Sequence, residues 1–352
     1  MGSEVFLEGL AKKIVRSCRT SLAKGITLVE SSLPRHNEQA VKLIELLSGC
    51  SSNRKDKQTF VIGVAGPPGA GKSTFIEALG LKLVGEGKSS LSDEIRKDIR
   101  TDFRKSSHKV AVISVDPSSP VSGGSILGDK TRMKLLGRSP NAYIRASPTR
   151  GVLGGIAERT NDVLFLCASA GYDICIVESV GVGQSEVEID EVVDMLLLVI
   201  PPGGGDDLQA SKKGIIEAVD LILVNKADGT LMPMAKTTKA DYSGSLKFVR
   251  KKHIDHKPTA MMISSKTGDG LDRVLEEVWK YRSVMTTNGG LIQKRLKQQK
   301  KCMWKVLERL VVDSIKNDKN MKRESMKLEL KLADGDITPS MAARSLLRNL
   351  EK

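Results

Sequence analysis

Aromatic residues, histidine and cysteine are all scarce in this chain of 352 residues. Aromatic side chains make up 3% of the sequence, and there are four histidines and five cysteines. No two cysteines have CxxC spacing and the histidines are scattered, so the sequence predicts neither a zinc site nor a disulfide framework. Cys167 and Cys175 lie in or beside apolar segments. We therefore expect them to be buried free thiols.

Long apolar runs are also missing. The run MLLLVI at 195–200 is far shorter than the roughly 20 residues of a membrane-spanning helix. The N-terminal stretch carries Glu4 and Glu8 and has no unbroken apolar core, which excludes a secretory signal. Residues 9–29 contain no acid, as in transit peptides, but residues 22–32 have the pattern of an amphipathic helix. We expect this part to be folded.

The net charge of +14 is unevenly distributed. Residues 292–352 contain 16 Lys or Arg and 8 Asp or Glu. Such a basic region is compatible with nucleic acid or an acidic membrane. However, Trp304 is its only aromatic residue, whereas single-strand binders combine basic charge with aromatic side chains. We expect solvated helices with one partner-facing side, and neither nucleic acid nor membrane as a partner.

The hydrophobic pattern changes twice along the chain. Apolar residues have helical spacing in residues 5–48 (Leu22, Ile26, Val29, Val41, Ile44 and Leu47), with a break at Pro34 that predicts at least two helices. Short apolar runs then alternate with helical patterns, which is typical of a parallel α/β sheet covered on both faces. The runs are 60–65, 110–115, 174–177, 195–200, 221–224 and 260–263. After about Val284 the chain is helical and charged, and Thr338 and Pro339 are placed to cap a last helix.

Three parts follow from this pattern. They are a helical segment (1–55), an α/β domain (56–284) and a helical C-terminal region (285–352). The polar segment 85–109 carries no motif and predicts a surface helix.

A phosphate-binding motif follows the first apolar run. The stretch GPPGAGKST matches G-x-x-x-x-G-K-[ST] and lies between a predicted strand and a predicted helix. Glycines let successive backbone N–H groups point at phosphate oxygens, Lys72 reaches the β- and γ-phosphates, and the helix N-terminus favours an anion. The sequence thus predicts a P-loop NTPase whose loop comprises Gly66, Pro67, Pro68, Gly69, Ala70, Gly71, Lys72, Ser73 and Thr74.

Acidic residues at strand ends predict a Mg²⁺ site. The Ser73 hydroxyl is one ligand, and Asp116 and Glu178 follow two apolar runs, where ligands bind in such sheets. Glu178 takes the place of the Walker-B acid. Gly181 is placed to contact a γ-phosphate, so that VGVGQSE is a candidate switch. Gln184 is a candidate for positioning the attacking water.

The motif N-K-x-D after another strand identifies the base. Asp228 can accept hydrogen bonds from N1–H and the 2-amino group of guanine, which adenine does not offer. Asn225 can brace the loop and Lys226 can lie over the base. Ser264, Ser265 and Lys266 follow the last strand, where a backbone contact to the guanine oxygen is expected. The predicted nucleotide is GTP, hydrolysed to GDP.

Four longer stretches resemble one known family. RASPTRGVLGG, VDPSSPVSGGSILGDKTRM, ESVGVGQSE and PPGGGDDLQASKKG are similar to the methylmalonic aciduria type A/MeaB family of P-loop GTPases, from about Leu22 to the C-terminal helices. The resemblance implies a homodimer with a C-terminal dimerisation arm. It also implies a GTP-dependent chaperone of methylmalonyl-CoA mutase that gates adenosylcobalamin delivery from an adenosyltransferase and helps release inactivated cofactor.

The resemblance also implies roles for individual residues. Asp129 joins Asp116 and Glu178 near Mg²⁺, and Asp206, Gln209 and Lys212 fall in a mobile segment that couples nucleotide state to the mutase. The family places its members in the mitochondrial matrix of eukaryotes and in the bacterial cytoplasm. This chain departs from the family pattern in its longer 85–109 segment, in DDLQAS where DELQGI is expected, and in lacking an evident transit sequence.

Two other function classes are left open by the residues alone. A GTPase metallochaperone for another metalloenzyme needs a Cys/His cluster, and a protein or amino-acid kinase needs an acceptor site and a base. The sequence shows neither. It also has no cobalamin-ligating DxHxxG pattern and no evident arginine finger, so we expect the cobalamin to sit on the partners and intrinsic hydrolysis to be slow.

Overall fold

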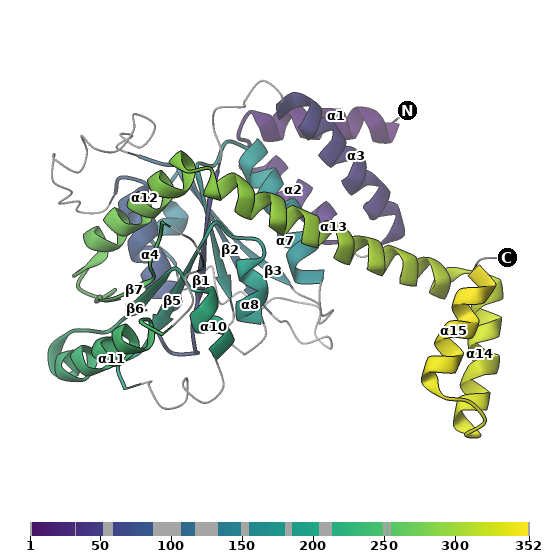
Figure 1. Cartoon of the computed structure of the whole chain (residues 1–352). Helices are drawn as coiled ribbons and strands as arrows, with labels where there is room; N and C mark the ends of the chain where they lie inside the picture. Colours follow the sequence, from purple (N-terminus) through teal and green to yellow (C-terminus); the bar gives the residue numbers. More distant parts are fainter. Residues whose placement is uncertain are drawn as a thin grey trace. The chain divides into compact units, whose positions relative to one another are not determined.

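A computed structural model shows the helices and strands that these segments form (Figure 1). It describes residues 2–31, 33–51, 59–86, 107–116, 133–148, 155–179, 185–203, 213–248, 252 and 255–350. The chain divides into two compact units, Met1–Leu296 and Lys297–Lys352. The first unit contains the sheet and the N-terminal helices.

Three helices precede the sheet, α1 (Gly2–Val15), α2 (Arg19–Glu30) and α3 (Pro34–Ser51). Pro34 is the first residue of α3, a position where a missing N–H costs nothing. Leu22 and Ile26 are buried as predicted. Of the apolar residues with helical spacing, Val41 is 57% exposed, and the buried position on that turn of α3 is Leu43.

A wholly parallel sheet of seven strands has the order β3-β2-β4-β1-β5-β6-β7, which confirms the predicted α/β class. Six strands coincide with the predicted apolar runs. The seventh, β3, was missed because it is an edge strand with polar residues at alternate positions. The strands are β1 (Phe60–Ala65), β2 (Val110–Asp116), β3 (Ala142–Pro148), β4 (Ile174–Ser179), β5 (Met195–Ile200), β6 (Leu221–Val224) and β7 (Thr259–Met262).

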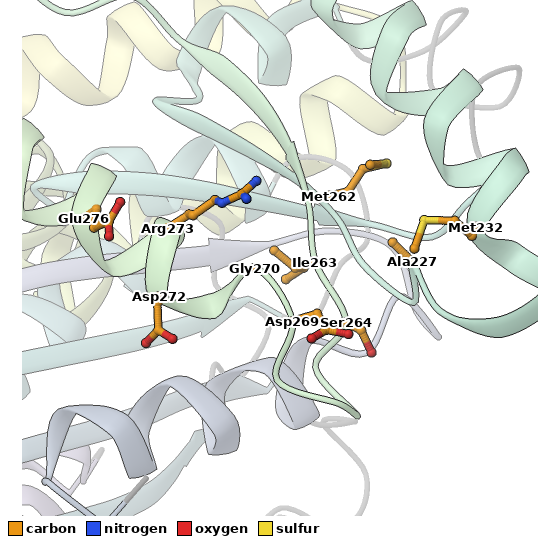
Figure 2. A pocket seen from close by; sticks show the side chains of 10 residues that line it. All are labelled: Ala227, Met232, Met262, Ile263, Ser264, Asp269, Gly270, Asp272, Arg273 and Glu276. Atoms are coloured by element: carbon orange, nitrogen blue, oxygen red, sulfur yellow. The ribbon is translucent and has the colours of Figure 1, made fainter. Parts of the chain in front are cut away.

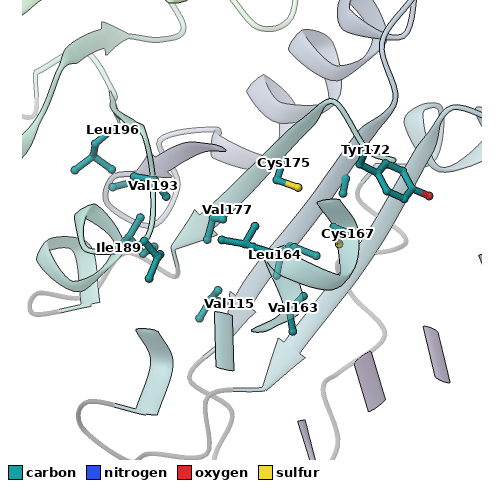
Figure 3. Close-up of a cluster of buried hydrophobic side chains, with 14 of the residues drawn as sticks. Val115, Val163, Leu164, Cys167, Tyr172, Cys175, Val177, Ile189, Val193 and Leu196 are labelled. Atoms are coloured by element: carbon teal, nitrogen blue, oxygen red, sulfur yellow. The ribbon is translucent and has the colours of Figure 1, made fainter. Parts of the chain in front are cut away.

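Alternate strand residues enter two separate cores, which explains why the strands inside the sheet are mostly apolar on both faces. One core lies against α4 (Lys72–Leu83), the short helix η3 (Leu136–Arg138) and α12 (Leu271–Thr287). The other lies against α1, α2 and α3 and against four further helices (Figure 3). These are α7 (Gly155–Ser169), α8 (Ser185–Asp190), α10 (Lys213–Ala218) and α11 (Met232–Ser245), the last preceded by η4 (Gly229–Leu231). Cys167 and Cys175 are buried and free in the second core, as predicted.

An ionic network lies at the amino ends of the strands. Arg295, near the start of α13 (Gly290–Asn317), binds both carboxylate oxygens of Asp194 at 2.7 and 2.6 Å. Lys294 contacts Asp190 at 3.1 Å and donates to the Asp194 carbonyl oxygen at 2.8 Å. Lys252 contacts Asp190 at 2.6 Å. The beginning of α13 is therefore part of the first unit.

The second unit consists of the rest of α13, α14 (Lys319–Ala333) and α15 (Pro339–Leu350). Asp318 caps α14 by accepting hydrogen bonds from the N–H groups of Asn320 and Met321. Pro339 begins α15 next to Thr338, as predicted. Large apolar side chains on these helices are exposed by 44% to 67%: Met303, Trp304, Leu307, Leu310, Val311, Val312, Met326, Leu330, Met341 and Leu347.

Among the residues that the structure describes, none of the helices combines the length and the apolar character needed to cross a bilayer. Most of the 85–109 segment, where a surface helix was predicted, lies outside the described residues.

Candidate nucleotide-binding site

The P-loop motif connects β1 to α4 at the carboxyl edge of the sheet. Gly66 and Gly71 have positive φ angles of 143° and 89°. A Cβ atom on Gly66 would lie 1.9 Å from the Val199 carbonyl oxygen, and one on Gly71 would lie 2.6 Å from the Asn225 amide nitrogen. Only glycine therefore fits at these two positions. The loop ends at the N-terminus of α4, where backbone N–H groups are available to an anion.

Lys72 folds back over this loop. Its ammonium group donates hydrogen bonds to the carbonyl oxygens of Gly66 at 2.7 Å and Pro67 at 3.2 Å. The residue is buried, with 9% of its surface exposed. Because these partners are neutral carbonyl groups, a phosphate oxygen would be a stronger partner for the same charge. The arrangement fits the predicted contact with the β- and γ-phosphates.

Glu178 lies near the end of β4, beside the first turn of α4. Its Oε1 accepts a hydrogen bond from the Ser73 hydroxyl at 2.9 Å, and its Oε2 accepts one from the Ser114 hydroxyl at 3.0 Å. Glu178 is 7% exposed and Ser114 is 3% exposed. The structure thus brings together two of the four residues predicted to hold Mg²⁺, Ser73 and Glu178, and adds Ser114. The only sequence signal for Ser114 is a hydroxyl inside an apolar run.

Asn225, at the end of β6, joins the predicted base-recognition loops to the P-loop. Its side-chain amide donates to the Ala70 carbonyl oxygen at 2.9 Å. Its side-chain oxygen accepts hydrogen bonds from the N–H and the hydroxyl of Ser265, at 3.0 and 2.8 Å. The residue is buried. One side chain therefore braces three loops at the carboxyl edge.

Asp228 and Ser264 face each other across these loops, since the Ser264 hydroxyl donates to an Asp228 carboxylate oxygen. The oxygen that accepts this bond is Oδ2 of Asp228. Lys226 has a φ of 58°, and both Lys226 and Lys266 are exposed. The residues predicted to bind guanine thus lie on two adjacent loops, after β6 and after β7.

A cavity of about 460 Å³ adjoins the same loops (Figure 2). Ala227 and Ser264 line it from the loops, and Arg273 and Glu276 line it from α12. Asp272, also in its wall, binds Lys82 of α4 at 2.7 Å. The cavity lies beside the predicted base site, and no sequence motif indicated it.

Several predicted residues cannot be placed in this site. Asp116 is the last residue of β2, at the carboxyl edge, but its side chain lies outside the described part. The other predictions fall wholly on residues that the structure does not describe: Asp129, Gly181, Gln184, Asp206, Gln209 and Lys212.

Comparison with known proteins agrees with this architecture. The family model described as methylmalonyl Co-A mutase-associated GTPase MeaB matches residues 22–91 and 84–320. The mouse mitochondrial methylmalonic aciduria type A homolog is 39% identical over 348 residues, which cover 97% of this chain and 79% of that protein. The GTPase ArgK of Escherichia coli is 37% identical over 346 residues, covering 98% and 97% of the two chains.

One solved structure resembles the whole chain. The crystal structure of an LAO/AO transport system kinase has 29% sequence identity and a TM-score of 0.70, and the match covers 99% of this chain and 98% of that one. The P-loop of β1 and α4, the parallel sheet and the matches over nearly the full length lead to one conclusion. The chain is a P-loop GTPase and belongs to the MeaB family.

Proposed function

We propose that this GTPase uses Mg²⁺ and GTP to act as a chaperone of methylmalonyl-CoA mutase. In this role it gates adenosylcobalamin loading, with an adenosyltransferase as indirect partner, and promotes release of inactivated cofactor. The family description and the name of the mouse relative support the choice of partner. The observation that carries the nucleotide part is the Asp228–Ser264 pair, held beside the P-loop by Asn225.

Guanine selection is the task of Asp228. Its carboxylate accepts from two adjacent guanine donors, while the Ser264 hydroxyl restricts its orientation. We expect Asp228→Asn to weaken GDP binding by at least about 100-fold, because a site built for hydrogen bonds rejects a mismatched partner strongly. Xanthosine diphosphate should bind this variant better than GDP, since its 2-carbonyl group accepts from the new amide.

Fluorescence titration with labelled nucleotides measures this change of preference from GDP to xanthosine diphosphate. Asp241→Asn on α11, an exposed position away from the loops, is the matched control and should leave GDP affinity unchanged. A variant at Asp228 that still prefers GDP would contradict the assignment.

The residues present suit Mg²⁺, because hydroxyl and carboxylate oxygens are its preferred ligands. Ser73 and Glu178 would hold it, with Asp116 and Asp129 as further candidates. Since the Ser73 hydroxyl donates its proton to Glu178, the oxygen lone pairs of Ser73 are left for the cation. When bound, Mg²⁺ neutralises phosphate charge during hydrolysis.

The remaining catalysis consists of positioning and charge stabilisation. Lys72 would move from the Gly66 and Pro67 carbonyl groups to the phosphates. Gly181 would contact the γ-phosphate and Gln184 would orient the attacking water. The segment with Asp206, Gln209 and Lys212 would transmit the nucleotide state to the mutase.

A homodimer built through the C-terminal helices completes the proposal. In α13, Met303, Trp304, Leu307 and Leu310 are each about half exposed, which favours a protein partner over solvent. The variant Leu307→Asp/Leu310→Asp should sediment as a monomer, and Gln299→Asp on the same helix should remain a dimer. A wild-type monomer at micromolar concentration would refute this part.

The site of action would be the mitochondrial matrix in a eukaryotic cell, as the names of the mouse and Caenorhabditis elegans relatives suggest, and otherwise the cytoplasm.

The decisive experiment measures GTP hydrolysis by the purified chain, alone and with methylmalonyl-CoA mutase from the same organism, with ATP as control. We expect slow hydrolysis alone and a clear acceleration by the mutase with GTP only. GTP hydrolysis that does not respond to the mutase would remove this partner. Transfer of labelled phosphate to an acceptor other than water would instead support a kinase, the activity named for the similar solved structure.

A further inference from the structure

Ser114 and Glu178 stand side by side on neighbouring strands. They are register partners in the parallel pair β2 and β4, so their side chains leave the sheet on the same face. This face carries α4, because Val110, Val112, Ile174 and Ile176 at the preceding alternate positions pack in the core that includes α4. The two polar residues therefore end two apolar rows directly beside the first turn of that helix.

The hydroxyl of Ser114 is unusual at its position in β2. Alternation along β2 predicts an apolar side chain at residue 114, where the structure has a serine with 3% exposure. Burying a hydroxyl is costly unless it forms a hydrogen bond. The bond it forms is the one to Oε2 of Glu178, at 3.0 Å.

The two serines hold the carboxylate of Glu178 from two sides. Ser73 of α4 donates a hydrogen bond to Oε1, and Ser114 of β2 donates one to Oε2. Glutamate has one more rotatable bond than aspartate, so its carboxylate can occupy more positions. Fixing it in one position therefore costs more conformational entropy. A donor on the adjacent strand removes that freedom before any ligand binds.

We propose that Ser114 is a positioning residue, which orients the Glu178 carboxylate toward Ser73 and thereby strengthens binding of the divalent cation that accompanies the nucleotide. This inference rests on the Mg²⁺ site of the proposed function. Ser114 acts through Glu178 and does not itself touch the nucleotide.

The test separates cation binding from nucleotide binding. A fluorescent GDP analogue is titrated with Mg²⁺, and its affinity is measured separately in EDTA. Ser114→Ala should raise the Mg²⁺ concentration for half-saturation about tenfold, as is typical for loss of a group that orients a ligand. Its affinity in EDTA should stay within about twofold of wild type, because the loop that holds the phosphates is unchanged. Loss of packing alone would not separate the two measurements in this way.

Three further variants make the result specific. Ser114→Thr keeps the hydroxyl and suits a strand, so it should retain the wild-type Mg²⁺ requirement. Ser114→Cys has a weak donor and should lie between wild type and Ser114→Ala, which provides a second measurement if the alanine variant folds poorly. Ser147→Ala is the matched control, since Ser147 on β3 also donates to a carboxylate, that of Glu30, away from Glu178.

Two outcomes would overturn the inference, and they differ. If wild-type GDP binding depends on Mg²⁺ and Ser114→Ala shows the same half-saturation, Ser114 has no positioning role. If wild-type binding does not depend on Mg²⁺ at all, the Mg²⁺ part of the proposed function fails together with this inference.

Discussion

The two edges of the sheet both contain buried charges, but they balance them in different ways. At the amino edge, Asp190 and Asp194 are paired with Lys252, Lys294 and Arg295. At the carboxyl edge, Lys72 is bound to carbonyl oxygens, and Glu178 is bound to hydroxyl groups. At the first edge these contacts pair charge with charge, and at the second these hydrogen bonds pair charge with neutral dipoles.

The difference separates a structural from a functional use of charge. Breaking an ion pair leaves an uncompensated charge, so a ligand gains little by competing for it. A charge whose hydrogen bonds are to neutral groups gains when an ion of opposite sign arrives. This contrast supports the proposal that the carboxyl edge binds phosphate and a cation, while the amino edge fastens the beginning of α13 to β1 and β5.

The largest expected effect comes from removing the ion pair between Arg295 and Asp194 at the amino edge. Arg295→Met leaves Asp194, whose side chain is 3% exposed, without its bidentate partner. We expect a loss of about 3 to 5 kcal/mol in the free energy of unfolding, measured by urea denaturation. Asp194 keeps its bond from the Val61 N–H at 2.8 Å, which limits the loss.

The contrast requires that this variant still hydrolyse GTP once folded. A folded Arg295→Met protein without activity would show that the amino edge takes part in the reaction. Arg309→Met on α13, whose ion pair with Asp313 is exposed, is the control and should lose less than about 1 kcal/mol.

For Lys72 we expect the reverse, a large effect on GTP hydrolysis and a small effect on stability. Lys72→Met removes a charge aimed at the phosphates, and we expect hydrolysis to fall by about 100- to 1000-fold, the range for loss of one stabilising group. The free energy of unfolding without nucleotide should change less, because the two hydrogen bonds to Gly66 and Pro67 that are lost go to neutral carbonyl groups of a loop. Steady-state hydrolysis and urea denaturation measure the two effects. A large loss of stability would make Lys72 a structural residue first.

The smallest expected effect is a pH dependence from Asp190. Burial raises the pKa of Asp190, but Lys294 and Lys252 outweigh burial and bring the pKa below its ordinary value of 3.8. The folded state therefore binds fewer protons than the unfolded state, so this contribution is complete above pH 3.8 and is lost as pH falls through the folded-state pKa.

Comparison with Asp190→Asn isolates that contribution. We expect the variant to be less stable by about 1.5 to 3 kcal/mol at neutral pH, the range for hydrogen bonds to charged groups. The difference should shrink in acid. A difference that stays constant down to low pH would come from packing and not from charge.

The pKa values of Lys252 and Lys294 shift in opposite directions. Burial lowers the pKa of Lys252, and the neighbouring charge of Lys294 lowers it further. Burial also acts to lower the pKa of Lys294, but Asp220, Asp190 and Asp194 together raise it above its usual value. Of the two, Lys294 is therefore the lysine for which the effect of the acids of the amino edge outweighs burial.

Most of the sheet could be predicted because a parallel strand buried on both faces is apolar at every position. Strand β3 could not, since it pairs only with β2 and its Arg145 and Ser147 turn to Glu30 of α2. That contact joins residues more than 100 positions apart. The buried face of α3 depends on packing in the same way, because Val41 is exposed and Leu43 is buried although both are apolar.

The site was predictable to the extent that its motifs are local. The P-loop, N-K-x-D and the serines after β7 are short stretches whose chemistry depends on residue type and spacing, and the sequence by itself determined them, together with the α/β class and the preference for guanine. The tertiary structure decided which polar groups meet. Ser114 meets Glu178, Asn225 joins three loops, and Lys294 and Arg295 reach the amino edge. These contacts depend on strand order and helix placement, which follow from the packing of the whole chain and not from any one segment.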